Sequence, residues 1–199
     1  ALKRPVREAE LPSILESIKR DSAMVRGAMQ NTMLRNDGYN FARIGNFIER
    51  ADNTARLVDV KFHAVQSDFY GAASAKDQEY DFYHWSAILR SVSAFEIYRR
   101  VYRNVIKPER VAELLILRAD MPRSLAASLH GVVSNLQMVT DDQNCETVRR
   151  AGKLNADLQY ARIDEILATG LHAYLTQFLD RVNELGAHIS RDFLVPTTA

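Results

Sequence analysis

Apolar residues recur at steps of three and four along most of the chain, which is the period of an amphipathic helix. The clearest run lies between residues 38 and 69 and predicts one long helix packed lengthwise against its neighbours. Its apolar positions are Phe41, Ile44, Ile48, Ala51, Ala55, Val58, Phe62, Val65 and Phe69. An earlier helix is predicted from Leu11 to about Met29, with Pro12 in its first turn. Asn36 or Asp37 is expected to cap the next helix.

A second long helix is predicted from His84 to Ile106, where it must stop before Pro108. Two adjacent apolar stripes run along this predicted helix. One holds Trp85, Ile88, Val92, Phe95, Tyr102 and Ile106, and the other holds Ala87, Ala94, Tyr98, Val101 and Val105. A helix that is apolar over so wide an arc is expected at the centre of its domain. The small and polar segment 71–80 before it is predicted to be a loop.

Four further helices are predicted to follow these two. They span 108–117, 122–138, 146–159 and 164–193, the last of them open to an interruption near Gly170. No segment alternates with period two for long enough to predict a strand. The sequence therefore predicts an all-α, single-domain helical bundle of six or seven helices. This domain is expected over 11–194, after a flexible segment at 1–10 and before a tail at 195–199.

The composition is that of an ordinary globular protein, with 47% hydrophobic and 26% charged residues in a chain of 199. A formal net charge of +1 gives no overall attraction to nucleic acid or anionic lipid. No apolar run approaches the ~20 residues of a membrane span. Cys145 is the only cysteine, so an internal disulfide is excluded and a reducing compartment fits best. We therefore expect a cytoplasmic protein without nucleic-acid or membrane partners.

Charged side chains line one shoulder of the apolar stripe in the helix predicted over 38–69. With an advance of 100° per residue, six positions fall together on that shoulder. They are Gly45, Glu49, Asp52, Arg56, Asp59 and His63, called here the polar ribbon. Arg43, Arg50 and Lys61 fall on the far side, so the neighbours Glu49 and Arg50 are predicted to point in different directions. The ribbon carries an excess of negative charge.

Arg99 stands in the stripe of Ile88, Val92, Phe95 and Tyr102, where an apolar side chain is expected. A buried guanidinium without a partner is too costly to keep. We therefore predict that Arg99 reaches a carboxylate of the polar ribbon, with Glu49, Asp52 and Asp59 as the candidates.

Two interpretations of the ribbon remain open. In the first, the charges only fix the register of helices in a bundle, which is the usual role of charged groups beside a core. In the second, the ribbon is an enzyme site or a pocket that binds a small anion. Arg56 and Arg99 would then hold a carboxylate or phosphate.

The segment around Arg123 and Ser124 also allows two interpretations. If a helix starts just before them, both lie in its first turn, where free N–H groups attract anions. The simpler interpretation is a plain capping segment.

Other chemistries find little support in the sequence. A di-iron bundle needs Glu-x-x-His motifs, which do not occur, so no metal site is predicted. Cys145 follows two acids in "DDQNC", and nearby negative charge raises the pKa of a thiol, so it is no candidate nucleophile. The chain has no glycine-rich phosphate loop, and no cofactor is predicted. Without a self-sufficient catalytic set, the chain is not expected to be an enzyme on its own.

Three segments together resemble the bacterial alpha-E family, helical proteins named for a Glu-Arg motif. They are "FARIGNFIERADNTARLVDVKFH", "HWSAILRSVSAFEIYRRVYRNVIKPERVAELLILRADMPRSL" and "ARIDEILATGLHAYLTQFLDRVNELG". The similarity runs from about Ser13 to Leu194. It places the Glu-Arg motif at Glu49 and Arg50, and it implies an all-helical fold. Typical members carry an earlier, related Glu-Arg segment, so this chain resembles their C-terminal portion.

The resemblance also implies a role beside other proteins. Genes of the family tend to accompany ATP-grasp-type peptide ligases and transglutaminase-like peptidases. We therefore expect an accessory helical domain that acts with an ATP-grasp-type amide ligase, with a homodimer or a missing N-terminal portion as further partners. The candidate ligand-binding residues are Glu49, Arg50, Asp52, Asn53, Arg56, Asp59, His63, Arg99, Arg123 and Ser124.

Overall fold

The computed structural model describes residues 7–68, 75–103, 105–142 and 144–194, and within these ranges the side chains of 61–68 and 75–81 are left out. Residues 1–6 of the predicted N-terminal segment 1–10, and the whole predicted tail 195–199, therefore lie outside the described residues. By its contacts the chain divides into two compact units, Ala1–Tyr39 and Asn40–Ala199. Each unit is described by itself.

The first unit contains a short 3-10 turn, Glu8–Glu10, and the helix α1, Leu11–Thr32. Pro12 lies in the first turn of α1, where its missing N–H breaks no hydrogen bond. No side chain of α1 is buried. The side-chain oxygen of Asn36 accepts the backbone N–H of Tyr39 at 3.3 Å, which confirms Asn36 as a cap of the following helix.

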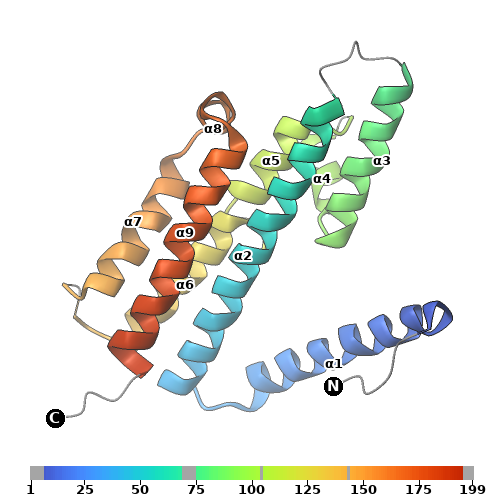
Figure 1. Ribbon diagram of the computed structural model, residues 1–199. Coiled ribbons are helices and arrows are strands. Elements are labelled where there is room, and N and C mark those ends of the chain that lie inside the picture. The colour runs from blue at the N-terminus through green and yellow to red at the C-terminus, as the bar shows by residue number, and fades with distance from the viewer. Residues whose placement is uncertain (1–6, 69–74, 104, 143, 195–199) are drawn as a thin grey trace. The chain divides into compact units, whose positions relative to one another are not determined.

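All other described elements are helical too (Figure 1). They are α2 Asp37–Asp68, α3 Ala75–Ser91, α4 Phe95–Tyr102, α5 Pro108–Ile116, α6 Leu125–Val139, α7 Glu146–Tyr160, α8 Ile163–Thr169, α9 Leu171–Ile189 and a π-turn Ser190–Leu194. The described residues contain no strand, so the all-α prediction is confirmed. The helix count is higher than the predicted six or seven because two predicted helices are each divided.

The predicted helix 84–106 is wrong, because the chain turns after Ser91. Ser93 adopts a left-handed φ of 56°. Its N–H donates to the Arg90 carbonyl at 3.0 Å, and the Ala94 N–H donates to the Leu89 carbonyl at 2.7 Å. This pair of bonds is the Schellman motif that ends helices, with serine where glycine is usual. The chain then starts again as α4.

Three other boundaries differ from or refine the predictions. Residues 75–80, predicted as loop, form the first turns of α3, whereas 71–74 lie outside the described residues. The helix predicted from Pro122 begins later, at Leu125. The interruption considered near Gly170 is confirmed. Gly170 has a φ of 103°, which a residue with a side chain rarely adopts, and it separates α8 from α9.

The core of the second unit forms around the apolar stripe of α2. Ile44, Ala51, Ala55 and Val58 are each at most 2% exposed, as the period of the stripe predicted. The far end of the predicted stripe, from Phe62 onward, lies outside the described side chains. Trp85, Leu89, Leu115, Leu129, Leu136, Leu175 and Phe178 add buried side chains from α3, α5, α6 and α9. Small residues on α2 allow these neighbours to approach closely.

A close approach in this core lies between α2 and α6. A Cβ built on Gly131 of α6 would lie only 2.5 Å from the ring of Phe47 on α2. Only glycine leaves room for the ring at this position.

None of the described helices is both long enough and apolar enough to cross a lipid bilayer.

Candidate functional site

The two residues of the Glu-Arg motif on α2 have different surroundings. The Arg50 guanidinium donates to the Pro122 carbonyl at 3.0 Å. One turn further along α2, the Thr54 hydroxyl donates to the Arg123 carbonyl at 2.9 Å. Glu49 is exposed. Glu49 and Arg50 therefore leave the helix in different directions, as predicted, and Arg50 bonds to the segment that connects α5 and α6.

The α5–α6 loop, residues 117–124, is stabilised from within. The Ser124 hydroxyl donates to the Arg118 carbonyl at 2.6 Å and accepts the Ala127 N–H at 2.9 Å, which caps α6. Met121 is 1% exposed and anchors the loop in the core. Arg118 forms an ion pair with Asp120, and this hydrogen-bonded contact lowers the pKa of Asp120 and raises that of Arg118.

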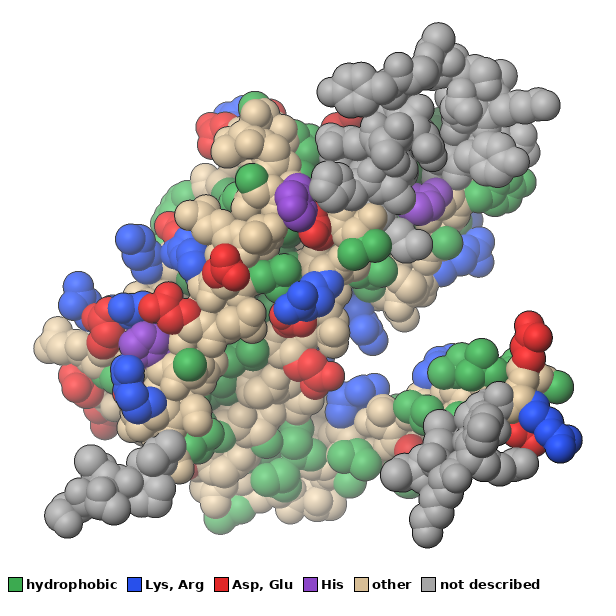
Figure 2. Space-filling view, in the orientation of Figure 1, with side chains coloured by type: hydrophobic (Ala, Val, Ile, Leu, Met, Phe, Trp, Pro, Cys, Tyr) green, Lys and Arg blue, Asp and Glu red, His purple; other side chains and the backbone are tan. Residues whose placement is uncertain are grey.

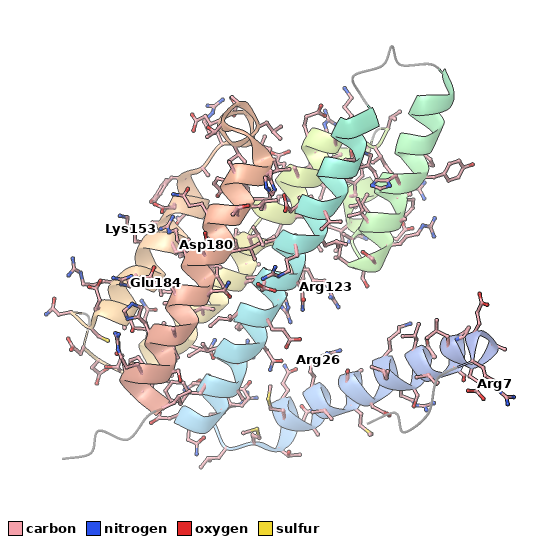
Figure 3. The ribbon with its side chains drawn as sticks, viewed as in Figure 1. Arg7, Arg26, Arg123, Lys153, Asp180 and Glu184 are labelled. Carbon is pink, nitrogen blue, oxygen red and sulfur yellow. The ribbon has the colours of Figure 1, made fainter. Side chains whose placement is uncertain are left out.

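These bonds support the capping interpretation of the Arg123–Ser124 segment, whereas anion binding by Arg123 and Ser124 stays a prediction. Ser124 is fully buried, and its hydroxyl already makes two protein hydrogen bonds. It fits a capping residue rather than a residue that offers its hydroxyl to an anion. Arg123 is exposed, and Figure 3 labels its side chain beside α2.

A ring of α2 lies under two cations of the same helix. The guanidinium carbons of Arg43 and Arg50 lie 5.2 Å and 5.3 Å from the centroid of Phe47. Both distances are within cation–π range. Since Phe47 also presses on Gly131, Arg50 connects the α5–α6 loop, the aromatic ring and α6. Its contacts are those of a structural residue.

Two of the three acids of the polar ribbon, Asp52 and Asp59, have partners other than Arg99. Asp52 accepts two hydrogen bonds from Arg56, at 2.8 and 3.0 Å, and this contact raises the pKa of Arg56. Asp59 lies 2.7 Å from Nδ1 of His172 on α9. Asn53 is exposed, and the side chain of His63 lies outside the described residues. The charged residues of the ribbon therefore make contacts within α2 and with α9.

The predicted inward position of Arg99 is wrong. Arg99 is exposed, and no ion pair joins it to the described carboxylates of Glu49, Asp52 or Asp59. The break at Ser93 changes the phase of the helix, so that Tyr98 turns into the core at 0% exposure. Arg99, the next residue, turns out to solvent. That residues of the ribbon bind a ligand stays a prediction.

A polar cavity lies elsewhere, between α7 and α9, and the sequence analysis missed it. Its volume is about 460 Å³. The lining residues are Glu146, Arg149, Arg150, Lys153, Leu154, Arg181, Glu184 and Leu185. Charged side chains gather where these two helices run side by side (Figure 2), and Figure 3 labels Lys153 of α7 near Glu184 of α9. The sequence does contain a signal for this cavity, because charged residues recur at steps of three and four from Glu146 to Lys153.

Among the described residues, no group of three or more His, Cys, Asp and Glu side chains gathers as a metal site would require. Cys145 is half-buried in front of the first turn of α7.

Comparison with known proteins gives one match. The model of the Alpha-E family, a predicted alpha-helical domain with a conserved ER motif, matches residues 1–194. This range includes the first unit, the second unit as far as Leu194, and all the helices described above. No curated protein and no solved structure matches the chain.

Proposed function

Because the chain belongs to the Alpha-E family of helical domains, we propose that it is an accessory domain that binds and assists an ATP-grasp-type amide ligase. The domain would supply a docking helix rather than catalytic groups. A transglutaminase-like peptidase acting on the same product would complete the system. The association of family genes with such enzymes, stated above, motivates this choice of partner.

The observation that carries the proposal is the apolar face of α1. Leu11, Leu15, Ile18 and Val25, called here the α1 stripe, lie on one face at steps of four, three and seven residues. Their exposed fractions are 45, 50, 53 and 65%. A stripe of this length presented by a single helix is the usual form of a helix-in-groove ligand. It offers its partner anchors at regular helical spacing.

The polar face of α1 keeps this helix compatible with water before it binds. Glu16 and Lys19 form an exposed ion pair at 2.8 Å, and Ser17 donates to Asp21 at 3.4 Å. Such contacts between residues three or four apart support the helix itself. In proteins, helices gain most of their stability from the surface that buries their apolar face.

The geometry of the Glu-Arg motif supports a scaffold role for its arginine. Arg50 bonds to a loop carbonyl and lies over Phe47, so its charge is directed into the fold. Glu49 is exposed and remains available for a contact with a partner.

The test is a titration of the full chain into a purified ATP-grasp-type amide ligase, followed by calorimetry. The double variant Ile18→Asp/Val25→Asp places two carboxylates in the α1 stripe and should weaken binding at least about tenfold, because each burial of an unpaired charge is costly. The matched control is Ala23→Asp/Gln30→Asp, which adds the same charges to exposed positions off the stripe. It should change the affinity by less than about twofold.

Two results would contradict the proposal. One is the absence of any heat of binding between the ligase and the wild-type chain. The other is binding of both double variants with the affinity of the wild type. If the α1 stripe instead mediates a homodimer, sedimentation would show a dimer that Ile18→Asp/Val25→Asp dissociates, with no effect on the ligase.

A further inference from the structure

The α7–α9 cavity has an apolar floor and charged walls. Leu154 and Leu185 form the floor, and they are 3% and 2% exposed. The wall of α7 consists of residues 146, 149, 150 and 153, which repeat at steps of three, one and three on one face. The wall of α9 consists of Arg181 and Glu184. Both walls are built on regular helices, which hold side chains in place better than loops do.

The two lining carboxylates are already used by protein cations. Glu146 accepts from Arg150 at 2.8 Å and lies 3.6 Å from Arg149. Glu184 bonds to the other side of the Arg150 guanidinium and lies 3.7 Å from His188. Arg150 is therefore held between two helices, and these hydrogen bonds raise its pKa.

The cations of the cavity exceed its carboxylates. Four cations and two carboxylates line it, which leaves an excess of two positive charges. Outside the lining, Asp157 takes up part of this excess by pairing with Arg181 at 2.6 Å. Lys153 is exposed and makes no ion pair with a described residue. Among the described residues, the ion pair of Arg149 is the long contact to Glu146 at 3.6 Å. Lys153 and Arg149 thus face the cavity with charge that the fold leaves largely unneutralised.

We propose that the α7–α9 cavity binds a small multivalent oxyanion, a phosphate or a carboxylate compound, between Arg149 and Lys153. Arg150 and Arg181, oriented by Glu184 and Asp157, provide further N–H donors behind them. Planar guanidinium groups suit both phosphate and carboxylate oxygens, and lysine adds a mobile point charge. A volume of about 460 Å³ admits a small molecule. This site is separate from the α1 stripe.

The experiment is a titration of the full isotope-labelled chain with sodium pyrophosphate and, separately, with sodium citrate, followed by amide correlation spectra. Saturable shifts are expected in α7 and α9. Raising the salt from about 50 to about 300 mM should weaken binding several-fold, because the site is open to solvent. Tighter binding of pyrophosphate identifies a phosphate ligand, whereas tighter binding of citrate identifies a carboxylate ligand.

The variant Arg149→Gln/Lys153→Gln removes the two unneutralised cations and should bind the better anion at least about tenfold more weakly. The matched control Arg100→Gln/Lys107→Gln removes two exposed cations outside the cavity and should stay within about twofold. All four positions are exposed, so thermal midpoints should be unchanged within about 2 °C.

Three results would overturn the proposal. The wild type would show no saturable shifts with either anion at millimolar concentration, the shifts would lie outside α7 and α9, or the control variant would lose as much affinity as Arg149→Gln/Lys153→Gln.

Discussion

The helices α1 and α2 are both long and amphipathic, yet they treat their apolar faces in opposite ways. In α2, neighbouring helices bury most of the apolar stripe, and Ile44, Ala51, Ala55 and Val58 are each at most 2% exposed. In α1, no residue is buried, and the stripe from Leu11 to Val25 is exposed by 45% or more. One helix organises a core, and the other presents a surface.

The polar groups follow the same division. On α2, Arg50, Thr54 and Asp59 each bond to another segment of the second unit. On α1, the side-chain bonds join residues three or four apart on the helix itself. Apolar residues that recur with a period of 3.6 therefore indicate that a helix has an apolar face to bury. They do not indicate whether the surface that buries this face belongs to the same chain.

The largest effect is expected at the contact between α2 and α6. Gly131→Ala places a methyl group about where the Phe47 ring lies, so we predict a loss of about 1–3 kcal/mol in the free energy of unfolding. Gly152→Ala is the control, since an added Cβ there meets nothing within 4 Å. It should stabilise α7 by about 0.5–1 kcal/mol. Urea unfolding measures both, and a Gly131→Ala protein as stable as the wild type would disprove the close approach.

The next effect is expected where α2 holds the α5–α6 loop. Thr54→Val keeps the shape of the side chain but leaves the Arg123 carbonyl without its buried donor, so about 1–2 kcal/mol of stability should be lost. Thr169→Val removes a similar hydroxyl from the exposed end of α8 and should cost less than about 0.5 kcal/mol. Equal losses in the two variants, measured by urea unfolding, would show that α2 does not hold this loop.

A smaller effect is expected at the C-terminal turn, which meets α2 through Phe193 and Phe41, with ring centroids 5.8 Å apart. The Thr147 hydroxyl donates to Asp192, and Arg191 adds a second contact, so the pKa of Asp192 lies below its ordinary value of 3.8. Because the folded pKa is lowered, this contribution to stability is present above about pH 4 and is lost as the pH falls through the folded pKa.

Thr147→Val should therefore raise the pKa of Asp192 toward 3.8, which a carboxyl-resonance titration measures. The variant should also lose less stability than the wild type when the pH falls below about 4. Thr140→Val, at the end of α6, is the control and should leave this pKa unchanged. An unaltered pKa in Thr147→Val would mean that Arg191 alone sets it.

The smallest effect is expected at Arg99. Because its side chain is exposed, Arg99→Ala and Arg99→Met should both unfold within about 0.5 kcal/mol of the wild type. A loss of several kcal/mol in Arg99→Ala that Arg99→Met avoids would instead indicate a buried and paired guanidinium.

The sequence predicted the helical class and the core face of α2 because both depend on a local period that the chain displays over many turns. It failed at Ser93, because a left-handed serine in a Schellman motif lacks the glycine that usually marks such a stop. The error at Arg99 followed from the error at Ser93. The prediction assumed an unbroken helix, and the direction of the Arg99 side chain was derived from the residues before the break. The pairing of Arg150 with Glu184 joins residues 34 positions apart, and only the packing of α7 on α9 reveals it.

The central claim is that α1 carries a docking face, whereas the apolar stripe of α2 is already buried. Amide hydrogen exchange of the full chain, with and without an ATP-grasp-type amide ligase, tests it most directly. The claim predicts fast exchange along Leu11–Thr32 in the free chain, strong slowing there when the ligase is added, and unchanged slow exchange around Ala51 and Ala55. An α1 that is already protected in the free chain, or one that stays unprotected with the ligase, would contradict it.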